Sequence, residues 1–367
     1  MKIIRFDPMI DKLTKENDHI LIDNFNLKHI KIKRNTLTDF IFRELELPTV
    51  LDEVLKNAKT SMIDGKKVKY ALDIMRENKW ISFSFFPDDM NYKDAIMKPL
   101  ECAIDNKFGK QIASYERYET DNYTRFDISD SLKNKRLCII GAGTVGGMLS
   151  VLSANTMIGN LTIIDGDIVE LSNLFRQPFY NENDLGRHKA VCIQEYLSKS
   201  MPETRVIPIL DYVDSIEKAN KYLVNFDLII QTGDFPRGSV NNLINEISVK
   251  KAIPILYISN NRIGPFYIPK LSKCYQCWDI SISRENKEVH QNTIKAASMQ
   301  STSNFPASSY GQLILIYYIF DILFDYLVNN KCSIINSSID INGNIFERNT
   351  EIKLEGGIYC GECQPLI

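Results

Sequence analysis

A glycine-rich turn between two apolar runs constrains the fold of this chain most strongly. The run Leu137–Ile140 is followed by three glycines in the spacing G-x-G-x-x-G: Gly141, Gly143 and Gly146. Met148–Ile158 has the length and apolar content of a packed helix, and a second apolar run, Leu161–Ile164, ends at Asp165. Residues without a β-carbon let a strand turn sharply into a helix and let a phosphate approach the backbone. The segment therefore predicts a nucleotide-binding βαβ unit.

Polar residues follow the second apolar run. Asp165 is suited to accept ribose hydroxyls, and the next polar residues are Asp167, Asn173, Arg176, Gln177 and Lys189. A redox dinucleotide needs neither a second carboxylate nor two cations here, whereas a triphosphate with Mg²⁺ needs both. Asp234 follows a third apolar strand, at the sheet edge where ligands of open α/β sheets bind. The pattern therefore favours ATP.

These residues resemble a known superfamily. DGDIVELSNLFRQ and DLGRHK, with the glycine turn, the later Asp and two Cys-x-x-Cys pairs, resemble the ThiF/MoeB/ubiquitin-activating enzymes, which adenylate C-terminal carboxylates. The resemblance runs from about Arg117 to the C-terminus. It implies that Asp165 holds the ribose, that Asp234 holds Mg²⁺, and that phosphates are held by Asn173, Arg176 and Lys189. The alternative is a Rossmann-like core that has lost ATP binding.

Strands and helices alternate through the rest of this region. We expect helices at Val191–Ser200, Ser215–Leu223 and Asn241–Lys250, and strands at Arg205–Ile209, Asp227–Gln231 and Ile253–Ile258. This alternation predicts an α/β fold with a doubly wound, mostly parallel sheet over residues 111–367. The resemblance implies that this sheet is Rossmann-like and of the ThiF type.

Residues 1–110 are expected to form a separate small unit. His19–Lys33 and Trp80–Phe86 have strand patterns, and three segments have helical patterns: Thr36–Leu45, Val50–Lys59 and Val68–Glu77. These elements predict a winged-helix-like α+β module, in which a sheet edge can take an extended peptide as an added strand. This layout, with ALDIMRENKWISF, resembles the microcin C-type peptide nucleotidyltransferases. A dimer-stabilising appendage is the alternative.

One departure from the family pattern concerns an arginine that reaches the partner subunit's ATP. The family carries R-Y-x-R before its first strand, and the matching residues here are Arg117, Tyr118, Glu119 and Thr120. The second arginine is missing, so either Arg117 or Arg125 substitutes for it or catalysis is altered. The resemblance also implies a homodimer with composite sites.

Eight cysteines occur, four of them in two Cys-x-x-Cys pairs: Cys274, Cys277, Cys360 and Cys363. Two such pairs complete a closed tetrahedral Zn²⁺ site without an open position, which predicts a structural metal. A redox-active pair is the alternative. Between Cys277 and Gln312 there is no cysteine, so thioester chemistry is disfavoured. We expect the polar segment QNTIKAASMQSTSNFPASS to cross over the active site instead.

Composition bounds the remaining classes of function. The 367 residues suggest about two domains, and the net charge of −2 offers no basic surface for nucleic acid. The longest apolar run, Leu313–Val328, contains Asp321 and Asp325 and is shorter than a spanning helix needs, so we expect a core or dimer helix and no membrane partner. No signal-peptide pattern follows Met1, and we expect a cytoplasmic protein.

The predicted reaction is ATP-dependent adenylation of the C-terminal carboxylate of a ribosomally made peptide. Arg176, Lys189 and Asp234 are the expected catalytic residues, with ATP, Mg²⁺ and Zn²⁺ as cofactors. The microcin C resemblance implies a peptide ending in Asn, which forms a succinimide and then an N–P-linked nucleotide. Two alternatives stay open. One is activation of a side-chain carboxylate for ring closure, as in pantocin-type proteins, and the other is a non-catalytic protein that presents leader peptides.

Overall fold

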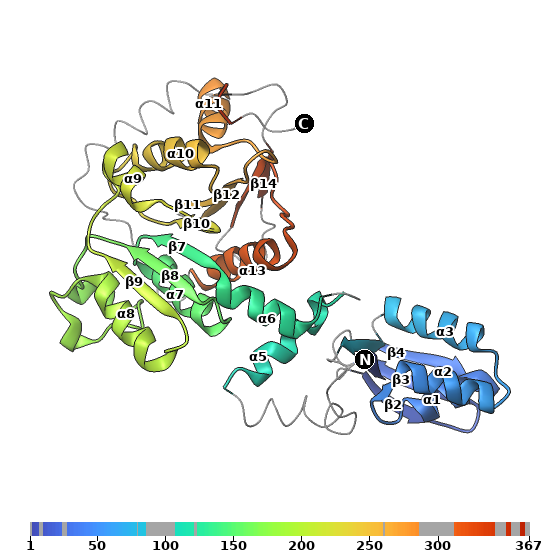
Figure 1. Cartoon of the computed structure of the whole chain (residues 1–367). Coiled ribbons are helices and arrows are strands. Elements are labelled where there is room, and N and C mark those ends of the chain that lie inside the picture. Colours follow the sequence, from blue (N-terminus) through green and yellow to red (C-terminus); the bar gives the residue numbers. More distant parts are fainter. Residues whose placement is uncertain are drawn as a thin grey trace. The chain divides into compact units, whose positions relative to one another are not determined.

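The computed structural model describes residues 2–6, 10–23, 28–78, 80–85, 107–120, 123–259, 261–285, 312–341, 350–353 and 360–363. The chain divides into two compact units, Met1–Ser129 and Asp130–Ile367 (Figure 1). This division lies later than the predicted boundary between residues 110 and 111. Helix α5 (Gly109–Ser114) and the start of α6 (Arg125–Asn134) belong to the first unit.

The larger unit is built on one eight-stranded sheet with the order β14-β13-β12-β11-β10-β7-β8-β9. Its parallel part comprises β7 (Arg136–Ile140), β8 (Asn160–Ile164), β9 (Arg205–Ile209), β10 (Leu228–Gln231) and β11 (Ile255–Ser259). Its antiparallel part comprises β12 (Arg262–Tyr267), β13 (Ser337–Asp340) and β14 (Thr350–Lys353). The predicted mostly parallel α/β fold is confirmed, and the antiparallel extension is an addition that the sequence patterns did not predict.

Helices cover both faces of this sheet, as a doubly wound fold requires (Figure 1). One group that packs together comprises α9 (Ile216–Tyr222), α10 (Val240–Lys251) and α11 (Tyr275–Glu285). The other comprises α7 (Thr144–Asn155), α8 (Lys189–Ser200) and α13 (Leu313–Asn329). Strand β10 is buried along its whole length, and β7 and β8 are buried after their first residues, which explains their continuous apolar runs.

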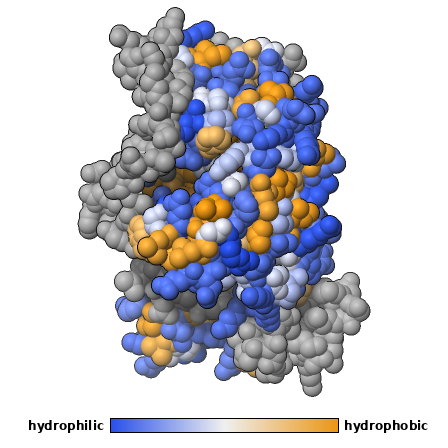
Figure 2. Space-filling model, turned by 90° about the vertical axis from the view of Figure 1, so that its left-hand side faces the viewer, coloured by the Kyte–Doolittle hydropathy of each residue, from blue (hydrophilic) through white to orange (hydrophobic). Residues whose placement is uncertain are grey.

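Helix α13 is the long apolar helix of the sequence, and it serves as a core element. Ile316, Ile319 and Leu323 are buried, while Leu313 and Tyr317 at its start are exposed. Among the described residues, no helix combines the length and hydropathy needed to cross a bilayer. On the face drawn in Figure 2, hydrophobic residues lie in patches between hydrophilic ones.

The smaller unit contains two three-stranded antiparallel sheets and a helical layer. One sheet has the order β5-β1-β6, formed by β5 (Thr49–Val50), β1 (Lys2–Phe6) and β6 (Ile81–Phe85). The other is the meander β2 (Ile10–Thr14), β3 (Asp18–Asp23) and β4 (Lys28–Lys33). Its core joins both sheets to α1 (Thr36–Glu44), α2 (Leu51–Thr60) and α3 (Gly65–Glu77). The predicted α+β composition of this unit is confirmed.

Side-chain caps explain where α1 and α3 begin. The Asn35 side chain accepts hydrogen bonds from the Leu37 and Thr38 backbone N–H groups, and Thr38 completes a capping box at the start of α1. Asp64 accepts from the Lys66 N–H, so α3 begins at Gly65, earlier than the apolar pattern alone suggests.

Candidate functional site

The glycine turn lies at the carboxyl end of β7, in the middle of the parallel sheet. Gly141 has φ +94, and a β-carbon there would lie 2.8 Å from the Gly233 backbone N. A β-carbon at Gly146 would lie 1.9 Å from the Gly141 carbonyl oxygen, so this glycine allows α7 to start against the turn. At Gly143 a β-carbon would have no neighbour within 4 Å. Gly143 is the N-cap of α7 and makes no side-chain cap, so no cap side chain occupies the first N–H groups of this helix, and helix N-termini of this kind bind anions.

Asp165 fixes this turn from the end of β8. Its carboxylate accepts from the Ala142 N–H at 2.5 Å and from the Asp167 N–H at 2.7 Å, and only 8% of the residue is exposed. Burial raises the pKa of Asp165, and the Lys189 charge opposes this shift. Tyr180 donates its hydroxyl to the Ala142 carbonyl at 2.9 Å from the other side. Asp165 thus shapes the turn, and its contact with a ribose stays a prediction.

Lys189 begins α8 and forms an ion pair with Asp167. Its Nζ lies 2.8 Å from Asp167 Oδ2, and its side chain is only 10% exposed. Tyr212, three residues after the end of β9, donates to the other oxygen of Asp167 at 2.5 Å. Burial would raise the pKa of Asp167, but the hydrogen bonds from Lys189 and Tyr212 hold this pKa below its usual range. The carboxylate is therefore ionised and keeps the ammonium beside the turn.

Arg176 and Gln177 converge on the first residue of α7. The Arg176 guanidinium and, at 3.4 Å, the Gln177 amide donate to the Thr144 hydroxyl oxygen. Burial lowers the pKa of Arg176, yet an arginine stays charged at neutral pH. Gln177 is 1% exposed, and its Oε1 has no hydrogen-bond partner in the described part of the chain. Asn173 is buried, and its side chain accepts from the Glu170 N–H, so it shapes the loop that presents Arg176.

Asp234 follows β10, the neighbour of β7 on the other side. Its side chain is 74% exposed and lies 3.2 Å from a guanidinium nitrogen of Arg237. A single exposed carboxylate fits the way proteins bind Mg²⁺, which takes one or two carboxylates and completes its shell with water and substrate phosphates. Three residues of this edge have contacts that the sequence did not predict: Thr144, Tyr212 and Arg237. Of these, Tyr212 had a usable signal, because it follows a parallel strand at the same sheet edge.

The four predicted metal ligands lie together in the second unit. The sulfur atoms of Cys274, Cys277, Cys360 and Cys363 all lie within 4.8 Å of one another. The Cys274–Cys360 and Cys277–Cys363 sulfur distances are 3.6 and 3.5 Å. Zn–S bonds of about 2.3 Å place tetrahedral sulfur ligands roughly 3.8 Å apart. The residues therefore fit Zn²⁺, and all four cysteines are free of disulfides.

The Cys277 sulfur also has the local environment of a thiolate. The Cys360 backbone N–H donates to the Cys277 sulfur at 3.3 Å. Metal ligation requires deprotonated sulfur, and donors aimed at sulfur stabilise that charge.

Arg117 and Arg125 are the two candidates to replace the family arginine that is missing at Thr120. Arg125 Nε lies 2.7 Å from Glu119 Oε1, and the two side chains are 3% and 2% exposed. This buried ion pair holds the start of α6, and the role of Arg125 as the substitute stays a prediction. Arg117 lies in η1 (Tyr115–Tyr118), and its side chain is outside the described residues. The segment 291–309, predicted to cross the active site, is also outside them.

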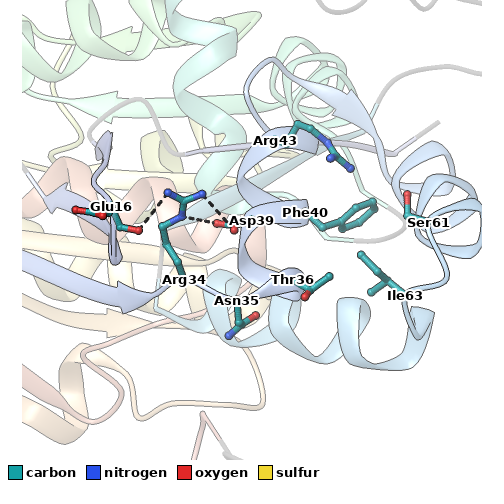
Figure 3. A pocket seen from close by; sticks show the side chains of 9 residues that line it. All are labelled: Glu16, Arg34, Asn35, Thr36, Asp39, Phe40, Arg43, Ser61 and Ile63. Atoms are coloured by element: carbon teal, nitrogen blue, oxygen red, sulfur yellow. Dashed lines mark hydrogen bonds and ion pairs between the residues drawn. The ribbon is translucent and has the colours of Figure 1, made fainter.

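A cavity of about 640 Å³ lies in the smaller unit, between the start of α1 and the loop from α2 to α3 (Figure 3). Arg34 lies beside Asp39 in it, with 2.9 Å between Nε and Oδ1. Phe40 and Ile63 line the cavity, and Arg43, 65% exposed, lies above the Phe40 ring. This cavity therefore combines an apolar wall with charged groups.

The arrangement at the sheet edge is that of a nucleotide-binding protein, and comparison identifies the class. Residues 115–341 match the model of the ThiF family, and the chain belongs to this family. The molybdopterin-synthase adenylyltransferase of Escherichia coli is 28% identical over 156 residues, which are 41% of this chain and 61% of that enzyme. The adenylyltransferase and sulfurtransferase UBA4 of Candida albicans is 26% identical over 48% of this chain and 41% of its own length. The chain thus spans about half the length of these curated relatives.

Solved structures of E. coli MccB share the fold over nearly the whole chain. MccB with ATP superposes with a TM-score of 0.72 at 19% identity, covering 98% of this chain and 99% of MccB. The microcin C7 biosynthetic enzyme MccB in complex with N-formylated MccA gives 0.73 at the same identity and coverage. The similarity therefore includes the smaller N-terminal unit as well as the ThiF domain.

Proposed function

We propose that this protein adenylates the C-terminal carboxylate of a peptide at the expense of ATP. The observation that carries the proposal is the gathering of charge at one sheet edge. Lys189, Arg176 and an N-terminal helix end without a side-chain cap lie around a turn that has open space at Gly143. These groups suit a triphosphate, because two cations and free N–H groups neutralise more charge than a dinucleotide carries there.

In the proposed reaction, a peptide carboxylate oxygen forms a bond to the α-phosphorus of ATP. The bond from that phosphorus to the bridging oxygen breaks, and pyrophosphate leaves with the electron pair. Positioning and charge neutralisation supply most of the catalysis in such transfers. Lys189 and Arg176 would stabilise the leaving pyrophosphate, and Asp234 would hold Mg²⁺, which supplies further positive charge to the phosphates. Zn²⁺ in the closed thiol cluster would be structural.

The smaller unit supports a peptide as the substrate. MccB, which shares this unit's fold, has been crystallised with a peptide, N-formylated MccA. In the described part of the chain, β4 is an edge strand of its meander, with half-buried Ile30 and Ile32 alternating with exposed Lys31 and Lys33. An extended peptide can add to such an edge through backbone hydrogen bonds.

ATP–pyrophosphate exchange with and without short Asn-terminated peptides tests this function. We expect peptide-dependent exchange, and mass spectrometry should show a product heavier by one nucleotide monophosphate. Loss of water from the peptide would instead indicate ring closure through an activated side-chain carboxylate. Peptide binding without ATP binding or exchange would leave only a non-catalytic presenting role. A homodimer with composite sites, which the family resemblance implies, would appear as a doubled mass in light scattering.

A further inference from the structure

The aromatic ring of Tyr212 lies against two neighbouring turns of the sheet edge. A β-carbon at Gly166, in the turn after β8, would lie 2.5 to 2.7 Å from three atoms of this ring. The ring centroid also lies 4.7 Å from that of Phe235, in the turn after β10. The absence of a side chain at Gly166 is therefore what gives Tyr212 its place.

From this place the Tyr212 hydroxyl fixes Asp167. It donates to Oδ1 at 2.5 Å, while Lys189 donates to Oδ2 at 2.8 Å. The Asp167 backbone N–H donates to Asp165 at 2.7 Å. Asp167 is thus held at three points, and its carboxylate has one orientation in which to receive the ammonium.

Tyr212 is itself fixed by a second carboxylate. Asp211 accepts from the Tyr212 backbone N–H at 2.8 Å, from Lys218 Nζ at 2.9 Å and from the Tyr222 hydroxyl at 2.6 Å. Lys218 and Tyr222 both belong to α9. A continuous series of contacts therefore runs from α9 through Tyr212 and Asp167 to Lys189.

We propose that Tyr212 is a positioning residue for the nucleotide, holding Lys189 beside the glycine turn through Asp167. A lysine side chain loses many rotamers when it binds a phosphate, and ordering it beforehand lowers that cost. The affinity for the triphosphate thus depends on a hydroxyl that acts through another residue. This inference rests on the proposed function, because it takes ATP as the ligand.

Tyr212→Phe removes the hydroxyl and keeps the ring contacts. We expect the KM for ATP to rise about tenfold, as loss of one hydrogen bond to a charged group allows. The kcat at saturating ATP and the melting temperature should stay close to those of the parent protein. Tyr196→Phe, at an exposed tyrosine of α8, is the matched control and should change none of the three. Calorimetry with Mg·ATP measures the same difference as a dissociation constant without any peptide.

The outcomes separate this inference from the proposed function. A Tyr212→Phe protein that binds ATP as the parent does would overturn the inference, and so would a lower melting temperature with unchanged affinity. A parent protein that binds ATP but never exchanges pyrophosphate would overturn adenylation alone, because the difference in ATP affinity can still be measured.

Gly166→Ala provides an independent test of the same contact. Its methyl group would displace the Tyr212 ring, so we expect a comparable rise in the ATP dissociation constant. In a Tyr212→Ala background the same substitution should add nothing, because the ring is already gone. If the ATP dissociation constant of the double variant rose by the product of the two single effects, the inference would be contradicted. Melting temperatures of all three variants establish that each is folded.

Discussion

Two sites of the larger unit differ in how their side chains are held. One is the polar sheet edge around the glycine turn, here called the nucleotide edge, and the other is the group of four cysteines, here called the thiol cluster. At the edge, side-chain cations contact polar groups of the protein and can also donate to a ligand, because a lysine has three N–H donors and an arginine five. Lys189 contacts Asp167, Arg176 contacts Thr144 and Arg237 contacts Asp234. At the cluster, cysteine sulfurs contact one another and backbone N–H groups, and Cys274, Cys277 and Cys363 are buried. The first site can therefore take a further ligand without losing its own contacts, and the second would be closed around a metal ion. Substitutions at the first should therefore change activity, and those at the second should change stability.

Lys189→Ala is expected to give the largest effect on activity. Removing one preorganised charge from the leaving pyrophosphate should lower exchange by about 10²- to 10³-fold. The melting temperature should change little, because Asp167 is half exposed and can be solvated. Lys199→Ala, an exposed lysine on the same helix, is the control. Equal exchange rates in the two variants would refute the assignment of Lys189 to phosphate.

Cys277→Ser, in contrast to Lys189→Ala, should mainly lower the stability of the protein. Loss of one thiolate weakens the metal site, and we expect a fall in melting temperature of about 10 °C, or roughly 3 kcal/mol. Cys332→Ser, at a half-buried thiol outside the cluster, should cost far less. Elemental analysis should find zinc in the parent protein and in Cys332→Ser, and much less in Cys277→Ser. A parent protein that melts at the same temperature with and without zinc would argue against a structural metal.

Two glycines of the same turn should show the two kinds of effect separately, one on ATP affinity and the other on stability. Gly143→Ala places a methyl group in open space, so stability should hold while ATP binds about tenfold more weakly. Gly146→Ala forces a β-carbon against the Gly141 carbonyl, so here the melting temperature itself should fall. Differential scanning calorimetry and ATP titration of both variants test this contrast. If both variants lose the same stability, Gly143 also has a packing role.

The sequence predicted those elements whose residues are contiguous in the chain or follow a spacing that is typical of metal ligands. The βαβ unit follows from one unbroken segment, and the thiol cluster follows from two Cys-x-x-Cys pairs, although Cys360 lies 83 positions after Cys277. Strand β12 was missed because it contains Gly264 and Pro265, which are typical of loops. Gly264, at φ +105, lies so close to β13 that a β-carbon would meet the Ser337 carbonyl oxygen at 3.0 Å. Two residues that are typical of loops therefore lie inside a strand here, where the glycine allows a close approach between β12 and β13.

Side-chain partners across the sheet edge could not be predicted from one sequence. Tyr212 reaches Asp167 only because β9 lies beside β8 and Gly166 leaves room for the ring. Arg125 forms a buried ion pair with Glu119, which the sequence did not predict. Both contacts depend on the directions of side chains after a turn, and no residue spacing encodes those directions.

The smallest expected effect concerns the support behind the nucleotide edge. Hydrogen bonds from Tyr222 and Lys218 lower the pKa of Asp211 to about 2, from an ordinary value of 3.8. A lowered carboxylate pKa contributes stability that is complete above about pH 4 and is lost as the pH falls toward about 2. Tyr222→Phe should therefore cost about 0.5 to 1 kcal/mol at neutral pH, after allowing for solvent screening at this partly exposed site. The difference in melting temperature from the parent should shrink below about pH 4. A difference that persists unchanged in acid would mean that Tyr222 acts through packing rather than through the Asp211 carboxylate.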